Sequence, residues 1–130
     1  MDAEYYEIKS EVATILNAAK KKGKKIIAVG TTATRTLESA SNENCELEKL
    51  SGWTSIFIYP GYRYKFINQL ITNFHLPNST PLMLTSAFVA QPYLDKEGWQ
   101  KGRDIIINAY REAINNKYRF YSFGDGMLIR

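Results

Sequence analysis

The single histidine of this sequence, His75, is the side chain best suited to exchange protons near neutral pH. It lies in the segment TNFHLP (residues 72–77), and an unperturbed imidazole has a pKa of about 6.5. A structural role stays open, because a lone histidine is more often structural than catalytic. The segment holds no cysteine, second histidine or carboxylate, which argues against a zinc site.

A second candidate for proton transfer, Asp125, lies between two glycines in the aromatic-rich segment YRFYSFGDGMLI (residues 118–129). The Gly-Asp-Gly turn can project the carboxylate as a hydrogen-bond acceptor, while the neighbouring aromatic rings can form a wall around a purine or a ribose. The alternative is that Asp125 only satisfies the amides of its own turn, which is the commoner task of an aspartate between glycines.

A turn rich in glycine and hydroxyl groups, GTTATRT (residues 30–36), leads into a predicted helix. Amides and hydroxyls at a helix N-terminus attract carboxylates and phosphates, so Thr31, Thr32 and Arg35 are candidate anion ligands. The alternative is a well-capped structural helix. The segment lacks the lysine of a P-loop and the complete GxGxxG of a dinucleotide fold, which disfavours nucleotide hydrolysis and NAD chemistry.

Aromatic and basic residues alternate in the segment YPGYRYK (residues 59–65). Tyr62 can stack on an unpaired base while Arg63 and Lys65 meet phosphates, as expected for a nucleotide in an RNA loop. The alternative is an aromatic-rich turn that covers one edge of the core. Residues 50–94 contain no acidic side chain, which suits a polyanionic partner, although this stretch is also simply rich in core residues.

The order of the elements predicts an α/β fold, a layered sheet of mostly parallel strands flanked by helices, with ligands at the carboxyl ends of the strands. Apolar periodicity and turn signals predict strands at 25–29, 55–59, 68–74 and 126–129, and helices at 7–22, 31–40, 80–90 and 100–116. The first strand is apolar enough to be buried on both faces. Ser10 and Thr80 are the expected caps of their helices.

The length of 130 residues and the hydrophobic content of 45% predict a single domain over residues 1–130. The sequence contains neither a long apolar run nor a basic segment followed by an apolar one, which predicts no membrane span and no signal peptide. The single cysteine, Cys45, has no partner for a disulfide, so we expect a reducing, cytoplasmic setting.

Five ordered blocks of the sequence closely resemble the S-adenosylmethionine:tRNA ribosyltransferase-isomerase family of queuosine biosynthesis. The blocks are IAVGTTATRTLES, FIYPGYRYK, LITNFHLPNSTPLMLTSAF, AYREAI and YRFYSFGDGMLI, and they extend over almost the whole chain. The resemblance is to the C-terminal portion of the family enzyme, which implies its α/β domain without the N-terminal portion and the β-barrel domain. We therefore expect a fragment of a longer enzyme that is inactive in isolation.

The resemblance implies a tRNA-modifying transferase-isomerase that uses S-adenosylmethionine as co-substrate. The ribosyl moiety of S-adenosylmethionine is transferred to 7-aminomethyl-7-deazaguanine in tRNA and isomerised, which forms epoxyqueuosine. Such a reaction needs proton transfer, stabilisation of the departing adenine and a pocket for an unstacked base, and it requires no metal. Matching these needs to the candidate residues, we expect catalytic roles for His75 and Asp125, cofactor binding by Thr31, Thr32 and Arg35, and tRNA binding by Tyr62, Arg63, Lys65 and Arg119.

These roles require the loops that bear His75, Arg35, Tyr62 and Asp125 to converge in one cleft at one rim of the sheet. The competing hypothesis is a noncatalytic tRNA-binding module, which binds tRNA with a steep salt dependence but does not bind S-adenosylmethionine. An ordinary methyltransferase is disfavoured, because the predicted strand at 55–59 ends in tyrosine where that fold needs an acidic residue.

Overall fold

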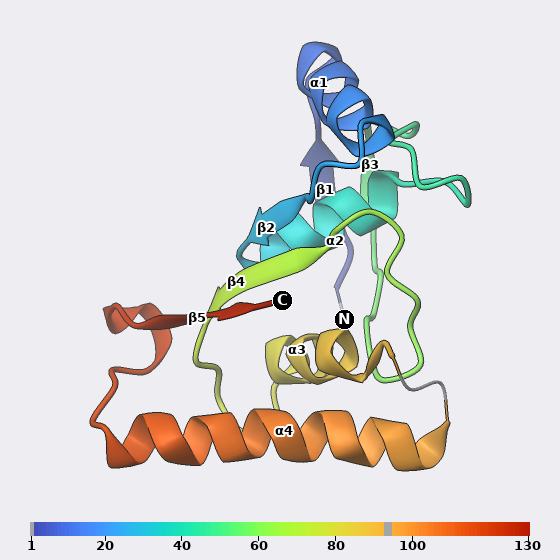
Figure 1. Ribbon diagram of the computed structural model, residues 1–130. Helices are drawn as coiled ribbons and strands as arrows, with labels where there is room; N and C mark the ends of the chain where they lie inside the picture. Colours follow the sequence, from blue (N-terminus) through green and yellow to red (C-terminus); the bar gives the residue numbers. More distant parts are fainter. Residues whose placement is uncertain (1, 93–94) are drawn as a thin grey trace. The chain divides into compact units, whose positions relative to one another are not determined.

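Strand β4 (Gln69–Asn73) contributes to both compact units of the chain and leads directly into the segment that bears His75. The computed structural model describes residues 2–92 and 95–130 (Figure 1). Unit 1 comprises Met1–Ile56, Tyr64–Ile71 and Arg130, and unit 2 comprises Phe57–Arg63 and Thr72–Ile129. The single domain expected from the length stays a prediction.

Unit 1 contains an antiparallel ribbon and a pair of parallel strands. Its elements are β1 (Glu4–Glu7), α1 (Ser10–Lys21), β2 (Ile27–Val29), α2 (Thr31–Ala40), β3 (Ser51–Thr54) and the first three residues of β4. Strands β1 and β3 form the ribbon, with Glu4 opposite Thr54. Strand β2 runs parallel to β4, with Val29 opposite Ile71.

A buried carboxylate fixes the chain that enters β4 in unit 1. The side chain of Glu38 on α2 is 1% exposed and accepts the main-chain N–H groups of Lys65, Phe66 and Ile67 at 2.8, 2.9 and 3.1 Å. Helix α2 is thereby tied to the three residues at positions 65–67, just before β4. The apolar core nearby is formed by Tyr6, Ala13, Ile26, Ala40, Leu47 and Phe66.

Unit 2 is built on two helices that pack closely. Its elements are α3 (Thr80–Ala90), α4 (Lys96–Asn115), the 3-10 helix η1 (Tyr121–Phe123) and β5 (Gly126–Ile129), which lies beside β4. Glycine is needed at the helix crossing, because a Cβ atom on Gly102 would lie 2.6 Å from the Cβ atom of Ala90. The buried core consists of Phe74, Ile106, Tyr110 and Ala113.

Side-chain caps set the starts of α3 and α4. The Ser79 hydroxyl accepts the N–H of Leu82 at 3.4 Å, so the cap of α3 lies one residue before the expected Thr80. Helix α4 begins four residues earlier than expected because the carboxylate of Asp95 accepts the N–H of Gly98 at 2.7 Å.

The expected start of the first helix was wrong. Residues 4–7 form β1, so α1 begins at Ser10 and its N-cap is Lys9, whose side chain makes no capping hydrogen bond. The hydroxyl of Thr14 donates to the Ser10 carbonyl, which is an ordinary contact within the helix.

The strand expected at 55–59 was also wrong, since the structure assigns no strand to these residues. The strand of this region lies earlier, in β3, where it pairs with the unexpected strand β1. The carbonyl of Ile56 accepts a hydrogen bond from Nε of Arg35 at 3.3 Å. A guanidinium from α2 therefore takes the place of a strand partner here.

The predicted α/β class is confirmed, and the predicted mostly parallel arrangement is seen in part. Within the described residues, the β2–β4 pair is parallel and the β1–β3 pair is antiparallel. Burial of the first strand on both faces was wrong, because Ile26 and Ala28 are buried while the alternate residues Ile27 and Val29 are 47% and 67% exposed. None of the described helices is long and apolar enough to cross a membrane.

Candidate functional site

His75 lies in the wall of a pocket of about 400 Å³ in unit 2, which we call the His75 pocket. The pocket is enclosed by the segment after β4, by helices α3 and α4, and by the aromatic segment that precedes β5. Its lining includes Leu82, Ile107, Tyr110, Arg111, Phe120 and Tyr121.

Two hydrogen bonds hold His75 in place. Its Nε2 atom lies 2.8 Å from the hydroxyl oxygen of Thr72, and its main-chain N–H donates to the hydroxyl oxygen of Tyr110 at 2.8 Å. Burial lowers the pKa of His75 below its ordinary value of 6.5. The neutral imidazole therefore predominates near pH 7, and it is the form that accepts a proton.

An aromatic cluster supports the backbone at His75. The ring of Phe74 contacts Tyr110 and Phe120, with centroids 5.3 and 4.9 Å apart, and these two rings contact each other at 5.7 Å. Burial raises the pKa of Tyr110, so its hydroxyl stays protonated at neutral pH. The packed rings hold Tyr110, whose hydroxyl oxygen accepts the main-chain N–H of His75.

Tyr121 is a site residue that the sequence reasoning did not single out. It lines the His75 pocket and also a second pocket of about 320 Å³ that contains His75. Its backbone has φ of 62°, in the left-handed region that a tyrosine rarely adopts. The strained conformation is fixed by its N–H, which donates to the Phe74 carbonyl at 3.0 Å, and by its carbonyl, which accepts from the Asn73 side chain at 2.6 Å.

Asp125 forms an ion pair with Arg119 in unit 2. Its Oδ2 atom accepts the main-chain N–H of Arg119 at 2.6 Å and lies 3.3 Å from Nε of the same residue. The hydrogen bond from the Arg119 side chain lowers the pKa of Asp125. The carboxylate is thus ionised and partnered, and Asp125 lines neither of the two pockets that contain His75.

The candidate anion ligands Thr31, Thr32 and Arg35 lie in unit 1, at the start of α2 and one turn later. Arg35 is 7% exposed, and its Nη1 atom forms an ion pair with the carboxylate of Glu4 at 2.5 Å. Its Nη2 atom is buried and has no hydrogen-bond partner among the described residues. A substrate carboxylate or phosphate at this guanidinium therefore has to compete with Glu4.

The basic and aromatic candidates of the YPGYRYK segment are divided between the two units. Tyr62 is half-buried and Arg63 is exposed in unit 2, where the N–H of Tyr62 donates to the Tyr59 carbonyl at 3.0 Å. Lys65 lies in unit 1, where its ammonium group donates to the carbonyl of Ser41 at 2.8 Å. Convergence of these residues with His75 and Arg35 in one cleft stays a prediction.

A family model described as "Queuosine biosynthesis protein" matches residues 1–129 of this sequence. The chain belongs to this family. The S-adenosylmethionine:tRNA ribosyltransferase-isomerase of Halothermothrix orenii is 54% identical to this chain over 129 residues. The match covers 99% of this chain and 34% of the relative. The protein of the same name from Clostridioides difficile is 50% identical over 130 residues, which cover 100% and 35%.

A solved structure of the queuosine biosynthesis family is also similar. The crystal structure of S-adenosylmethionine tRNA ribosyltransferase from Thermotoga maritima matches with a TM-score of 0.80 at 42% sequence identity, and the match covers 97% of this chain and 40% of that one. The family resemblance inferred from the five sequence blocks is confirmed. This chain spans about a third of the length of the curated relatives it matches.

Proposed function

We propose that this chain is part of an S-adenosylmethionine:tRNA ribosyltransferase-isomerase of queuosine biosynthesis. The observation that carries the proposal is sequence identity. About half of the residues, along almost the entire chain, are identical in relatives that bear this name. In the proposed reaction, S-adenosylmethionine donates its ribosyl group to the aminomethyl group of 7-aminomethyl-7-deazaguanine in tRNA. Adenine and methionine leave, and epoxyqueuosine is formed.

His75 is the proposed proton-transfer residue of this reaction. The sulfonium of S-adenosylmethionine is itself electron-withdrawing, so the enzyme has to remove a proton beside it and position the reactants. A histidine whose pKa is lowered by burial is neutral at pH 7 and is suited to accept that proton. The hydroxyl of Thr72 at 2.8 Å fixes the orientation of the ring.

Asp125 acts in this proposal as an ionised group that holds Arg119 in position for a tRNA phosphate. The Arg119 side chain is 67% exposed, so its guanidinium can contact a tRNA phosphate while it stays paired with Asp125. Tyr62, Arg63 and Lys65 contact the anticodon loop, and Thr31, Thr32 and Arg35 bind the methionine carboxylate of S-adenosylmethionine. An enzyme that modifies tRNA in this way works in the cytoplasm together with the remaining portions of the same protein.

A chimeric enzyme tests the proposed function. The matching residues of the Halothermothrix orenii relative are replaced by this chain, and the purified protein is incubated with S-adenosylmethionine and tRNA that carries 7-aminomethyl-7-deazaguanine. We expect epoxyqueuosine in the digested tRNA and one equivalent of free adenine, both absent when S-adenosylmethionine is omitted. The unmodified relative serves as the positive control.

The competing tRNA-binding module gives a different result in the same experiment. A folded chimera that binds tRNA but shows no heat of binding with S-adenosylmethionine by calorimetry, and forms no product, contradicts the proposed function. Circular dichroism of the chimera and the relative verifies that both are folded.

A further inference from the structure

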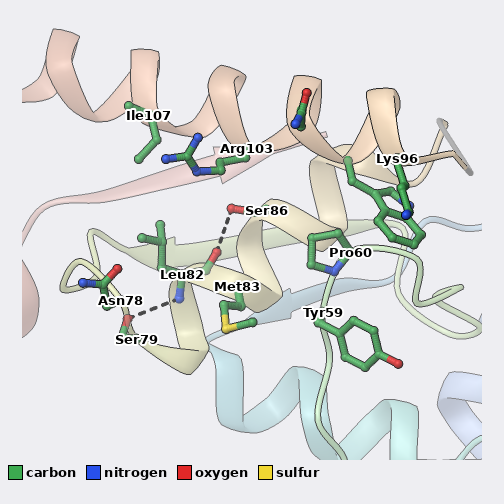
Figure 2. A pocket seen from close by; sticks show the side chains of 12 residues that line it. Tyr59, Pro60, Asn78, Ser79, Leu82, Met83, Ser86, Lys96, Arg103 and Ile107 are labelled. Atoms are coloured by element: carbon green, nitrogen blue, oxygen red, sulfur yellow. Dashed lines mark hydrogen bonds between the residues drawn. The ribbon is translucent and has the colours of Figure 1, made fainter.

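A larger pocket of about 700 Å³ lies in unit 2, between α3, α4 and the turn at Tyr59 and Pro60. Figure 2 shows side chains from these three segments around a common space. We call it the Trp99 pocket. Its apolar lining includes Pro60, Leu82, Met83, Trp99 and Ile107.

The indole of Trp99 is held tightly against the turn. A Cβ atom on Gly61 would lie 2.7 Å from Cζ2 of Trp99, and the φ of Gly61 is 103°, so only glycine allows this approach. The Nε1–H of Trp99 is buried and has no acceptor among the described residues. Because this nitrogen is sealed from solvent, Trp99 lines the pocket with the rest of its indole ring, an apolar aromatic surface for a ligand.

The polar rim of the pocket is basic. Lys96 and Arg103 are the charged residues among its described lining residues, and none of these described residues is acidic. The guanidinium of Arg103 lies 3.6 Å from the carboxylate of Asp104, with both side chains mostly exposed. An exposed pair of this kind is weak, so Asp104 competes little with a phosphate.

On these observations, and resting on the function proposed above, we propose that the Trp99 pocket binds an unstacked nucleotide of the tRNA. The base lies in the apolar interior, stacked on the ring of Trp99. Its phosphate lies at Lys96 and Arg103. Aromatic rings combined with basic groups are the usual means of binding unpaired nucleotides.

Electrostatics favours a tRNA nucleotide over S-adenosylmethionine as the occupant. S-adenosylmethionine carries a sulfonium and an ammonium group against one carboxylate, and its net positive charge is repelled by Lys96 and Arg103. A phosphodiester is attracted by the same two side chains.

The pocket adjoins the His75 pocket, since both are lined by Leu82 and Ile107. A nucleotide bound against Trp99 is therefore a near neighbour of the nucleotide that is modified beside His75. The Trp99 pocket thus holds the RNA loop open while chemistry takes place next to it.

Tryptophan fluorescence of the chain itself tests this site, because the sequence has two tryptophans, Trp53 and Trp99. In the Trp53→Phe variant, a stem-loop RNA with the sequence of the tRNA anticodon arm should quench the emission, since Trp99 stacks on a base. In the Trp99→Phe variant the remaining Trp53 should not respond, and the RNA affinity measured by anisotropy should fall by about tenfold.

Salt dependence tests the basic rim. The slope of log affinity against log salt is negative, and Lys96→Gln and Arg103→Gln should each make it shallower by about one. Lys22→Gln, at an exposed position of unit 1, should leave the slope unchanged.

Three results overturn the site: absence of RNA binding, RNA binding without a change in Trp99 emission, or quenching of Trp99 by S-adenosylmethionine alone. Product formation by the chimera reports on the proposed function separately. An active chimera whose rate and RNA affinity are unaffected by Trp99→Phe would retain that function and lose this site.

Discussion

The Nε2 atom of His75 and the hydroxyl oxygen of Thr72 lie 2.8 Å apart, and the Thr72 side chain is buried. Thr72→Val keeps the shape of the side chain and removes the hydrogen bond, so the imidazole loses the group that orients it. We expect turnover of the chimera to fall by about fivefold to tenfold, the worth of one hydrogen bond. Unchanged turnover and an unchanged pH profile would show that Thr72 does not position His75.

Burial of His75 predicts a specific pH dependence. Its pKa is lower in the folded chain than the ordinary value of 6.5, so the neutral form persists as the pH falls below that value. The unfolded chain then binds more protons than the folded one, and the contribution of His75 to stability is present above about pH 6.5 and is lost as the pH falls. Proton NMR of the one imidazole in the sequence measures this pKa directly, and a midpoint at or above 6.5 contradicts the prediction.

Removing the buried carboxylate of Glu38 should weaken unit 1. In Glu38→Gln, one of the two acceptor oxygens becomes an amide that faces the N–H donors of residues 65–67. We expect a loss of about 3 kcal/mol in the free energy of unfolding, measured by urea denaturation. Glu48→Gln, at an exposed position of the same unit, is the control and should change stability by less than about 0.5 kcal/mol.

The close packing of α3 against α4 predicts that one added methyl group at Gly102 destabilises the fold. In Gly102→Ala the new Cβ atom meets the Cβ atom of Ala90 at 2.6 Å and its main-chain N at 2.9 Å, so the helices have to move apart. We expect a destabilisation of about 2 kcal/mol in thermal or urea unfolding. Asn108→Ala, on the exposed surface of α4, is the matched change and should have little effect. Equal stability of the two variants would contradict the close packing.

Local signals were sufficient for α2, β4 and α3. The glycine before α2, the Ser-Thr-Pro start of α3 and the NQLITNF segment around β4 are each encoded within a few residues, and the predicted ranges agree with the structure to within one residue. The ribbon of β1 and β3 was missed because its pairing joins residues almost fifty positions apart, and β3 includes a glycine that weakens the strand pattern.

For the candidate site, the sequence supplies the histidine but not its neighbours, and the roles of the site residues stay predictions. His75 stands out by residue type alone, whereas its partners Tyr110 and Tyr121 reach it through the fold. Trp99 was overlooked because the helix was expected to start after it. The pairing of Arg35 with Glu4 joins residues 31 positions apart, a relationship that no local pattern contains.

The rate of the chemical step with and without the imidazole tests the central role of His75. Single-turnover formation of epoxyqueuosine is measured for the chimera and its His75→Ala variant at saturating S-adenosylmethionine and tRNA, with Lys22→Gln as the matched control. We predict a rate lower by about a hundredfold or more in His75→Ala, with unchanged tRNA affinity and a control rate equal to that of the parent. A loss of less than about threefold would contradict the assignment of proton transfer to His75.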